Sequence, residues 1–269
     1  MKIPDIELKS KATVPQLGLG TYKLTGTSCY NLVKDAISLG YRHIDTAEYY
    51  GNEDPIGAAI RQIDRKMLFI TSKVWRDNLR YEDVIKACEK TIRNLNTDYL
   101  DLYLVHWPNS SIPLKETLDA MQYLHEKKRI RTIGVSNFPI ERVKEAMLLS
   151  KLPICIDQVE FHVFLHQPGL LDFCNKNNIR ITAYSPLAKG AVYKENYLIE
   201  LGKKHKKTAG QIALRWLIEK GIIAIPKGST REHIKENMEI FDFKLNDKEI
   251  SEIDKLPQHR IVAPVFSEF

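Results

Sequence analysis

The chain has 269 residues and a formal net charge of +6, and 43% of its residues are hydrophobic. These values suit one large domain over residues 1–269 and exclude a disordered chain, while the charge is too diffuse to indicate a nucleic-acid partner. No apolar run approaches the roughly 20 residues that cross a bilayer, and the first residues lack a signal-peptide pattern. We therefore expect a cytoplasmic protein without a membrane partner.

Short strand patterns alternate with helical patterns along the whole chain. The expected strands are residues 16–21, 41–46, 68–74, 100–106, 132–136, 155–160, 180–185 and 222–226. The expected helices are residues 28–39, 53–62, 82–94, 114–127, 140–149, 168–177 and 208–220, followed after the last strand by 231–237 and 247–255. Asn246 and Glu249 have the spacing of a capping box at the start of the last helix.

Eight strands, each followed by a helix, predict an α/β fold of the closed (β/α)₈ or TIM-barrel type. Residues 154–156 and 222–225 are continuously apolar, as parallel strands buried on both faces should be. Residues 3–14 lie outside the repeat and could form a β-hairpin that closes the bottom of the barrel. A doubly wound open sheet is the alternative, but no Gly-x-Gly-x-x-Gly follows the first strand.

Two further features have plain structural interpretations. The basic cluster at residues 203–207 is more typical of a solvated helix end than of a phosphate site. The four cysteines show neither metal-ligand nor disulfide spacing, so we expect no metal and buried free thiols at Cys29, Cys88, Cys155 and Cys174.

Four side chains capable of proton transfer stand where apolar strands meet loops: Asp45, Tyr50, Lys73 and His106. The active sites of barrels form at the carboxyl ends of the strands, so all four map to one rim. A free phenol has a pKa of about 10, which a nearby lysine ammonium would lower and an aspartate would help to position. We expect Tyr50 to be the general acid for a carbonyl oxygen, with a neutral His106 orienting the substrate.

Other interpretations remain open from the residues alone. Asp45 could cap a turn, His106 could be structural, and Tyr49 competes with Tyr50 as the functional phenol. A second function makes Lys73 the Schiff-base lysine of a barrel aldolase. A third is a non-catalytic barrel that binds a nucleotide as a redox sensor.

Seven motifs in the chain resemble those of the aldo-keto reductase family, and they occur in the family's order. They are residues 18–21 (GLGT), 40–53 (GYRHIDTAEYYGNE), 72–75 (SKVW), 104–108 (LVHWP), 133–138 (IGVSNF), 183–187 (AYSPL) and 225–227 (IPK). The resemblance implies a (β/α)₈ barrel and reduction of aldehydes and ketones to alcohols with NADPH. It also implies a catalytic tetrad of Asp45, Tyr50, Lys73 and His106, which selects Tyr50 over Tyr49.

The resemblance also assigns the cofactor contacts. Ser136, Asn137 and Gln158 match residues that bind the nicotinamide carboxamide, and Tyr184 matches the aromatic residue that stacks on the nicotinamide ring. Further matches are Thr21, Asp45 and the pyrophosphate loop of Ser185, Pro186 and Leu187.

The adenosine end departs from the family pattern. Where that pattern places lysine, serine and arginine around the 2′-phosphate, this chain has Lys227, Gly228 and His233; Glu236 and Asn237 match adenine contacts. Histidine cannot form arginine's permanently charged fork, although Ser229 and Thr230 could compensate in part. We expect NADPH to be used and NADH to be tolerated.

Tyr22, Trp75 and Trp107 match the aromatic lining of the family's substrate pocket, beside Tyr50 and His106. The chain after Pro257 is short, which suggests an open pocket. It resembles the microbial branch that reduces small dicarbonyls, keto-sugars and aldehydes, so we expect a small carbonyl substrate and a monomer.

Overall fold

The large sheet of the protein contains eight strands that follow one another in chain order. The computed structural model describes residues 3–262 and 264–269. Each neighbouring pair of strands is parallel, from β3 to β10. The strands are β3 (Leu19–Gly20), β4 (His43–Asp45), β5 (Phe69–Val74), β6 (Leu100–Val105), β7 (Ile130–Ser136), β8 (Ile154–Glu160), β9 (Arg180–Tyr184) and β10 (Ile223–Ala224).

Hydrogen bonds between the first and last strands close this sheet into a barrel. Leu17, just before β3, forms a parallel bridge with Ala224 of β10. The amide of Gly18 donates to the carbonyl of Ala224 at 2.9 Å, and the amide of Ala224 donates to the carbonyl of Gln16 at 2.9 Å. The predicted barrel is therefore confirmed, and the doubly wound open sheet is wrong.

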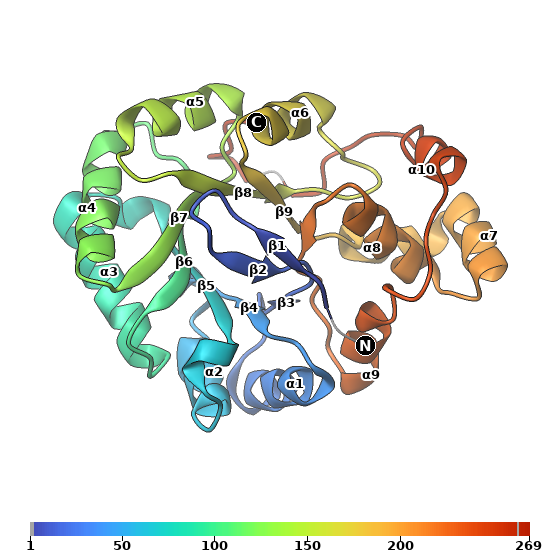
Figure 1. The fold of residues 1–269 in the computed structure, drawn as a ribbon, viewed down its shortest axis with the longest axis horizontal. Coiled ribbons are helices and arrows are strands. Elements are labelled where there is room, and N and C mark those ends of the chain that lie inside the picture. The colour runs from blue at the N-terminus through green and yellow to red at the C-terminus, as the bar shows by residue number, and fades with distance from the viewer. Residues whose placement is uncertain (1–2, 263) are drawn as a thin grey trace.

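Helices surround the barrel on its outer side (Figure 1). They are α1 (Gly26–Leu39), α2 (Glu53–Ile60), α3 (Tyr81–Asn94), α4 (Leu114–Glu126), α5 (Ile140–Leu149), α6 (Pro168–Lys176), α7 (Asn196–His205), α8 (Ala209–Glu219), α9 (Arg231–Met238) and α10 (Asp247–Ile253). Asn246 and Glu249 form the expected capping box of α10. No helix in the described ranges is long and apolar enough to span a membrane.

The sequence-based prediction omits helix α7, so β9 and β10 are separated by two helices instead of one. The last turn of α7 contains much of the basic cluster of residues 203–207. Lys204 pairs with Glu249 at 2.8 Å, and Lys207 pairs with Asp242 at 2.7 Å. The prediction of a helix end is thus correct, and two of its cations are used in ion pairs. The four cysteines are buried free thiols, as expected.

The N-terminal segment forms the expected hairpin. Strands β1 (Asp5–Glu7) and β2 (Thr13–Pro15) are antiparallel and cross the end of the barrel in Figure 1. Leu8 and Val14 are buried in one cluster with barrel residues, including Phe69 at the start of β5. Because the hairpin covers the amino ends of the strands, the opposite rim is left for a site.

Candidate active site

The four predicted proton-transfer residues lie at the carboxyl end of three adjacent strands. Asp45 is the last residue of β4, Lys73 is next to last in β5, and His106 follows β6 directly. Tyr50 ends a single turn of 3₁₀-helix, η1 (Glu48–Tyr50), which follows β4. Because neighbouring parallel strands end at the same rim, residues distant in sequence meet here.

Lys73 is the centre of this group. Its Nζ lies 2.5 Å from Asp45 Oδ1, 2.8 Å from the Thr46 carbonyl oxygen and 3.4 Å from the Tyr50 hydroxyl. The Lys73 side chain is fully buried, and that of Asp45 is nearly so. The ring of Tyr50 lies 5.6 Å from that of His106, so all four side chains are in one cluster.

Burial sets the protonation of this cluster. It lowers the pKa of Lys73, an effect that the charge of Asp45 opposes. Burial, reinforced by the charge of Lys73, holds the pKa of His106 well below 6.5, so its imidazole is neutral as expected. The net pKa of Tyr50 in the free protein is raised, not lowered as expected. Burial, followed by the charge of Asp45, raises the pKa of Tyr50 well above 10, so the phenol keeps its proton.

The neighbouring phenol of Tyr49 occupies a different environment. Its side chain is 56% exposed, whereas Tyr50 is half-buried beside Lys73. The Tyr49 ring stacks on Trp75, with centroids 4.0 Å apart and 16° between the planes. Of the two, only Tyr50 has its hydroxyl within hydrogen-bond distance of Lys73.

The predicted nicotinamide contacts are connected to the same cluster by hydrogen bonds. Gln158 Nε2 donates to Asp45 Oδ2 at 2.7 Å, and the Ser136 hydroxyl donates to the Gln158 carbonyl at 2.7 Å. The Tyr184 hydroxyl donates to Asn137 Oδ1 at 2.8 Å. Asn137 Nδ2 in turn donates to the His106 carbonyl at 3.0 Å, and the Thr21 hydroxyl donates to the Asp45 carbonyl at 2.9 Å.

The loop after β9 contains an unusual run of backbone conformations. Ser185 has a φ of 50°, and Ala188, Lys189 and Gly190 have φ values of 50°, 50° and 93°. Within this loop the amides of Ala188 and Gly190 donate to the carbonyls of Ser185 and Leu187, each at 2.8 Å. The loop includes the predicted pyrophosphate contacts Ser185, Pro186 and Leu187, and these internal hydrogen bonds hold it in a tight turn.

The predicted adenosine contacts lie around the start of α9. Lys227 is exposed and Gly228 is buried, and a Cβ at Gly228 would lie 2.4 Å from Ile234 Cγ2. The Ser229 hydroxyl lies 3.2 Å from His233 Nδ1. Serine therefore does not fit at position 228, and the adjacent hydroxyl is paired with the histidine that replaces arginine.

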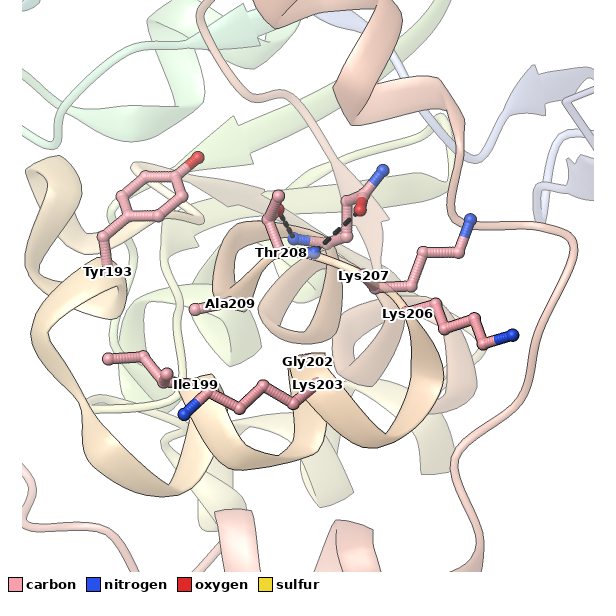
Figure 2. A pocket seen from close by; sticks show the side chains of 9 residues that line it. Tyr193, Ile199, Gly202, Lys203, Lys206, Lys207, Thr208 and Ala209 are labelled. Carbon is pink, nitrogen blue, oxygen red and sulfur yellow. Dashed lines mark hydrogen bonds between the residues drawn. The ribbon is translucent and has the colours of Figure 1, made fainter.

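A cavity of about 390 Å³ lies where α7 ends and α8 begins (Figure 2). Thr208 lines this cavity and donates its hydroxyl to Glu236 Oε1 at 2.7 Å. Asn237 is buried next to Glu236 in α9. Neither the tetrad nor the predicted adenosine contacts line this cavity, so it is a separate feature of the surface.

Aromatic side chains surround the tetrad. The centroid of Trp75 lies 5.2 Å from that of His106, and that of Tyr22 lies 5.0 Å from Tyr50. The short C-terminal segment returns to this aromatic wall. Phe266 packs edge to face on Trp75 and Trp107, at centroid distances of 5.8 and 5.3 Å.

The sequence did not predict that the C-terminal segment returns to the barrel, nor the contacts that hold it there. The buried carboxylate of Glu160 accepts the amides of Ile261 and Val262, and Arg142 Nε pairs with Glu268 at 2.7 Å. It also missed Glu48, which accepts the Trp75 amide. The position of Glu48 inside the motif of residues 40–53 is the one signal that could have indicated it.

Residues 16–258 match the model of the Aldo/keto reductase family. The glyoxal reductase of Bacillus subtilis is 39% identical over 262 residues, 96% of this chain and 95% of that protein. A solved structure of a putative 2,5-diketo-D-gluconic acid reductase B is 37% identical with a TM-score of 0.95, covering 99% of this chain and 96% of its own. A Bombyx mori aldo-keto reductase solved in complex with NADP is 31% identical with a TM-score of 0.92, covering 98% and 96%.

Proposed function

The chain belongs to the aldo-keto reductase family and is an oxidoreductase, and from that premise we propose that it reduces aldehydes and ketones to alcohols with NADPH. The single observation that carries the proposal is the position of Lys73 Nζ between Asp45 and the Tyr50 hydroxyl. This arrangement suits proton delivery to a carbonyl oxygen better than it suits any nucleophilic role.

In the proposed reaction, the Tyr50 hydroxyl donates a hydrogen bond to the carbonyl oxygen and transfers its proton as negative charge develops there. NADPH, when bound, supplies the hydride. The ammonium of Lys73 then stabilises the tyrosinate, which offsets the burial that raises the pKa of Tyr50. Asp45 holds that ammonium in place, and the neutral imidazole of His106 orients the carbonyl.

The same premise assigns the coenzyme contacts. Ser136, Asn137 and Gln158 would hold the carboxamide, Tyr184 the nicotinamide ring, and the loop that starts at Ser185 the pyrophosphate. Lys227 supplies one cation for the 2′-phosphate, but His233 pairs with Ser229 and provides no permanent charge. We therefore propose that NADPH is used and NADH is tolerated.

The aromatic wall suggests the substrate class. Trp75, Trp107 and Phe266 would cover the apolar face of a small carbonyl compound and exclude water near the reacting carbon. The glyoxal reductase among the relatives supports a small dicarbonyl as one substrate. The proposal includes a monomeric protein acting in the cytoplasm.

The aldolase alternative requires Lys73 as a free amine. Its Nζ already contacts a carboxylate, a backbone carbonyl and a phenol. Burial lowers its pKa, but the pairing with Asp45 opposes that effect and favours the ammonium, which is not nucleophilic. This geometry supports the reductase over the aldolase.

Glyoxal, aromatic aldehydes and keto-sugars assayed with both reduced coenzymes test the proposal. We expect loss of coenzyme absorbance with several carbonyls and formation of the corresponding alcohols. The absence of coenzyme oxidation, together with a borohydride-trapped substrate adduct on Lys73, would contradict it.

A further inference from the structure

One cation stands at the edge of the aromatic wall without an acidic partner. Arg76 begins the turn η3 (Arg76–Asn78), directly after Trp75. Its guanidinium carbon lies 4.4 Å from the centroid of the Phe266 ring, and Phe266 in turn packs on Trp75 and Trp107. Arg76 is therefore part of the mouth of the proposed substrate pocket.

Within the described residues, no carboxylate lies within 4.0 Å of the Arg76 guanidinium, and its buried Nε has no hydrogen-bond partner. The adjacent Asp77 does not pair with it; that carboxylate accepts the indole N–H of Trp75 at 3.2 Å. The Nε is covered by protein, so a ligand carboxylate would be bound by the two Nη atoms, which make no hydrogen bond to the described residues. By comparison, the half-buried Arg65 is paired with Asp101 at 2.6 Å, and the half-buried Arg42 donates to the carbonyls of Ile37 and Tyr41.

The backbone that carries Arg76 is held on both sides. Glu48 of η1 accepts the Trp75 amide and the Asn78 side-chain amide, the latter at 3.2 Å. Asn109, which follows β6, donates to the Arg76 carbonyl at 3.0 Å. These contacts fix the turn that contains Arg76 to the turn that contains Tyr50. A residue that binds one end of a substrate while Tyr50 contacts the other must be held in this way.

We propose that Arg76 selects carbonyl substrates that carry a carboxylate, with the carbonyl at Tyr50 and the carboxylate at the pocket mouth. The inference rests on the proposed function and narrows its substrate class to aldehydes and ketones that are also acids. A guanidinium binds a carboxylate through two parallel hydrogen bonds, which a neutral ester cannot reproduce. The other cation nearby, Lys23, is exposed and lies 5.6 Å from the Tyr22 ring, where water screens its charge.

The test compares 4-carboxybenzaldehyde with its methyl ester, which share the ring and the reacting aldehyde. We expect KM for the acid to rise about tenfold in Arg76→Gln while KM for the ester and kcat for both change less than about twofold. Arg76→Lys, which retains the charge, should recover part of the loss. Arg80→Gln is the matched control, because Arg80 is exposed and 3.8 Å from Glu116, and it should change neither substrate.

Three results would overturn the inference. These are an unchanged KM for the acid in Arg76→Gln, an equal loss for acid and ester, or loss of the acid preference in Lys23→Gln instead. Calorimetric titration of 4-carboxybenzyl alcohol, the expected product, separates this inference from the proposed function. If no variant reduces either aldehyde but the alcohol binds about tenfold more weakly to Arg76→Gln, the carboxylate site stands and the reductase proposal fails.

Discussion

The ammonium of Lys73 lies 2.5 Å from the carboxylate of Asp45, and both side chains are buried. A buried ion pair of this kind is costly to break, because removing one partner leaves the other charge uncompensated. The contact therefore links the stability of the barrel to the chemistry of its rim.

Replacing Asp45 with asparagine tests that link. The variant keeps the shape of the side chain but leaves Lys73 without a counter-charge, so burial should lower the pKa of Lys73 further. We expect a loss of about 3–5 kcal/mol in the free energy of unfolding and at least a tenfold lower kcat. Asp119→Asn, at an exposed pair with Lys115, should cost about 0.5 kcal/mol or less. Equal effects of the two substitutions in denaturant titrations would contradict the role given to Asp45.

The pH dependence of carbonyl reduction should follow the directions of the tetrad's pKa shifts. His106 has a pKa well below 6.5 and Tyr50 one well above 10, so neither changes protonation near neutrality. We expect kcat/KM to show no acid limb through neutral pH, and the first alkaline loss to come from Lys73, whose pKa is lowered. A midpoint near pH 6.5 would show instead that His106 titrates in the working range.

The coenzyme preference should respond to His233. His233→Arg adds a permanent charge and a bidentate donor, so we expect the ratio of kcat/KM for NADPH over NADH to rise about tenfold. Lys235→Arg, on the same helix, keeps its charge and serves as the control. Gly228→Ser should not raise the ratio, because its Cβ would lie too close to Ile234. A preference for NADPH above about a thousandfold in the unaltered protein would contradict the tolerance of NADH.

Asp157 is a fully buried carboxyl whose oxygens lack a well-formed hydrogen bond among the described residues, although the Phe138 backbone amide partly favours its charged form. Burial raises its pKa well above 3.8 in the folded state. Asp157 therefore ionises at a lower pH in the unfolded chain than in the folded protein. The stability that its neutral form contributes at low pH is lost as the pH rises from about 4 toward the folded pKa. The Asp157→Asn variant cannot ionise at this position and so does not lose this stability. Its melting temperature should therefore exceed that of the unaltered protein at pH 7, by about 2–4 °C for each kcal/mol recovered. Near pH 4 the two melting temperatures should match. A lower melting temperature at pH 7 would contradict the assignment.

Most of the site could be predicted because it follows from strand ends. Asp45, Lys73 and His106 each stand at the carboxyl end of a strand, and a parallel barrel brings such positions to one rim whatever their separation in sequence. The position of Tyr50 required the family resemblance, because Tyr49 fits the same spacing.

The features that could not be predicted from the sequence depend on contacts between distant residues. Helix α7 contains Gly202, which weakens a helical pattern, yet a Cβ there would lie 2.6 Å from the Lys207 carbonyl oxygen. The return of Phe266 depends on the Glu160 and Arg142 contacts, which no local pattern reveals. The raised pKa of Tyr50 likewise comes from burial by the assembled rim.

The role of Tyr50 as proton donor is tested most directly by the turnover of Tyr50→Phe beside that of Tyr49→Phe, each with NADPH and an aromatic aldehyde. Both variants lose one hydroxyl and keep the ring. We expect kcat of Tyr50→Phe to fall about a hundredfold or more with little change in NADPH affinity, and kcat of Tyr49→Phe to stay within about threefold of the unaltered protein. Retention of more than about a tenth of the activity by Tyr50→Phe, or an equal loss in Tyr49→Phe, would show that Tyr50 is not the proton donor.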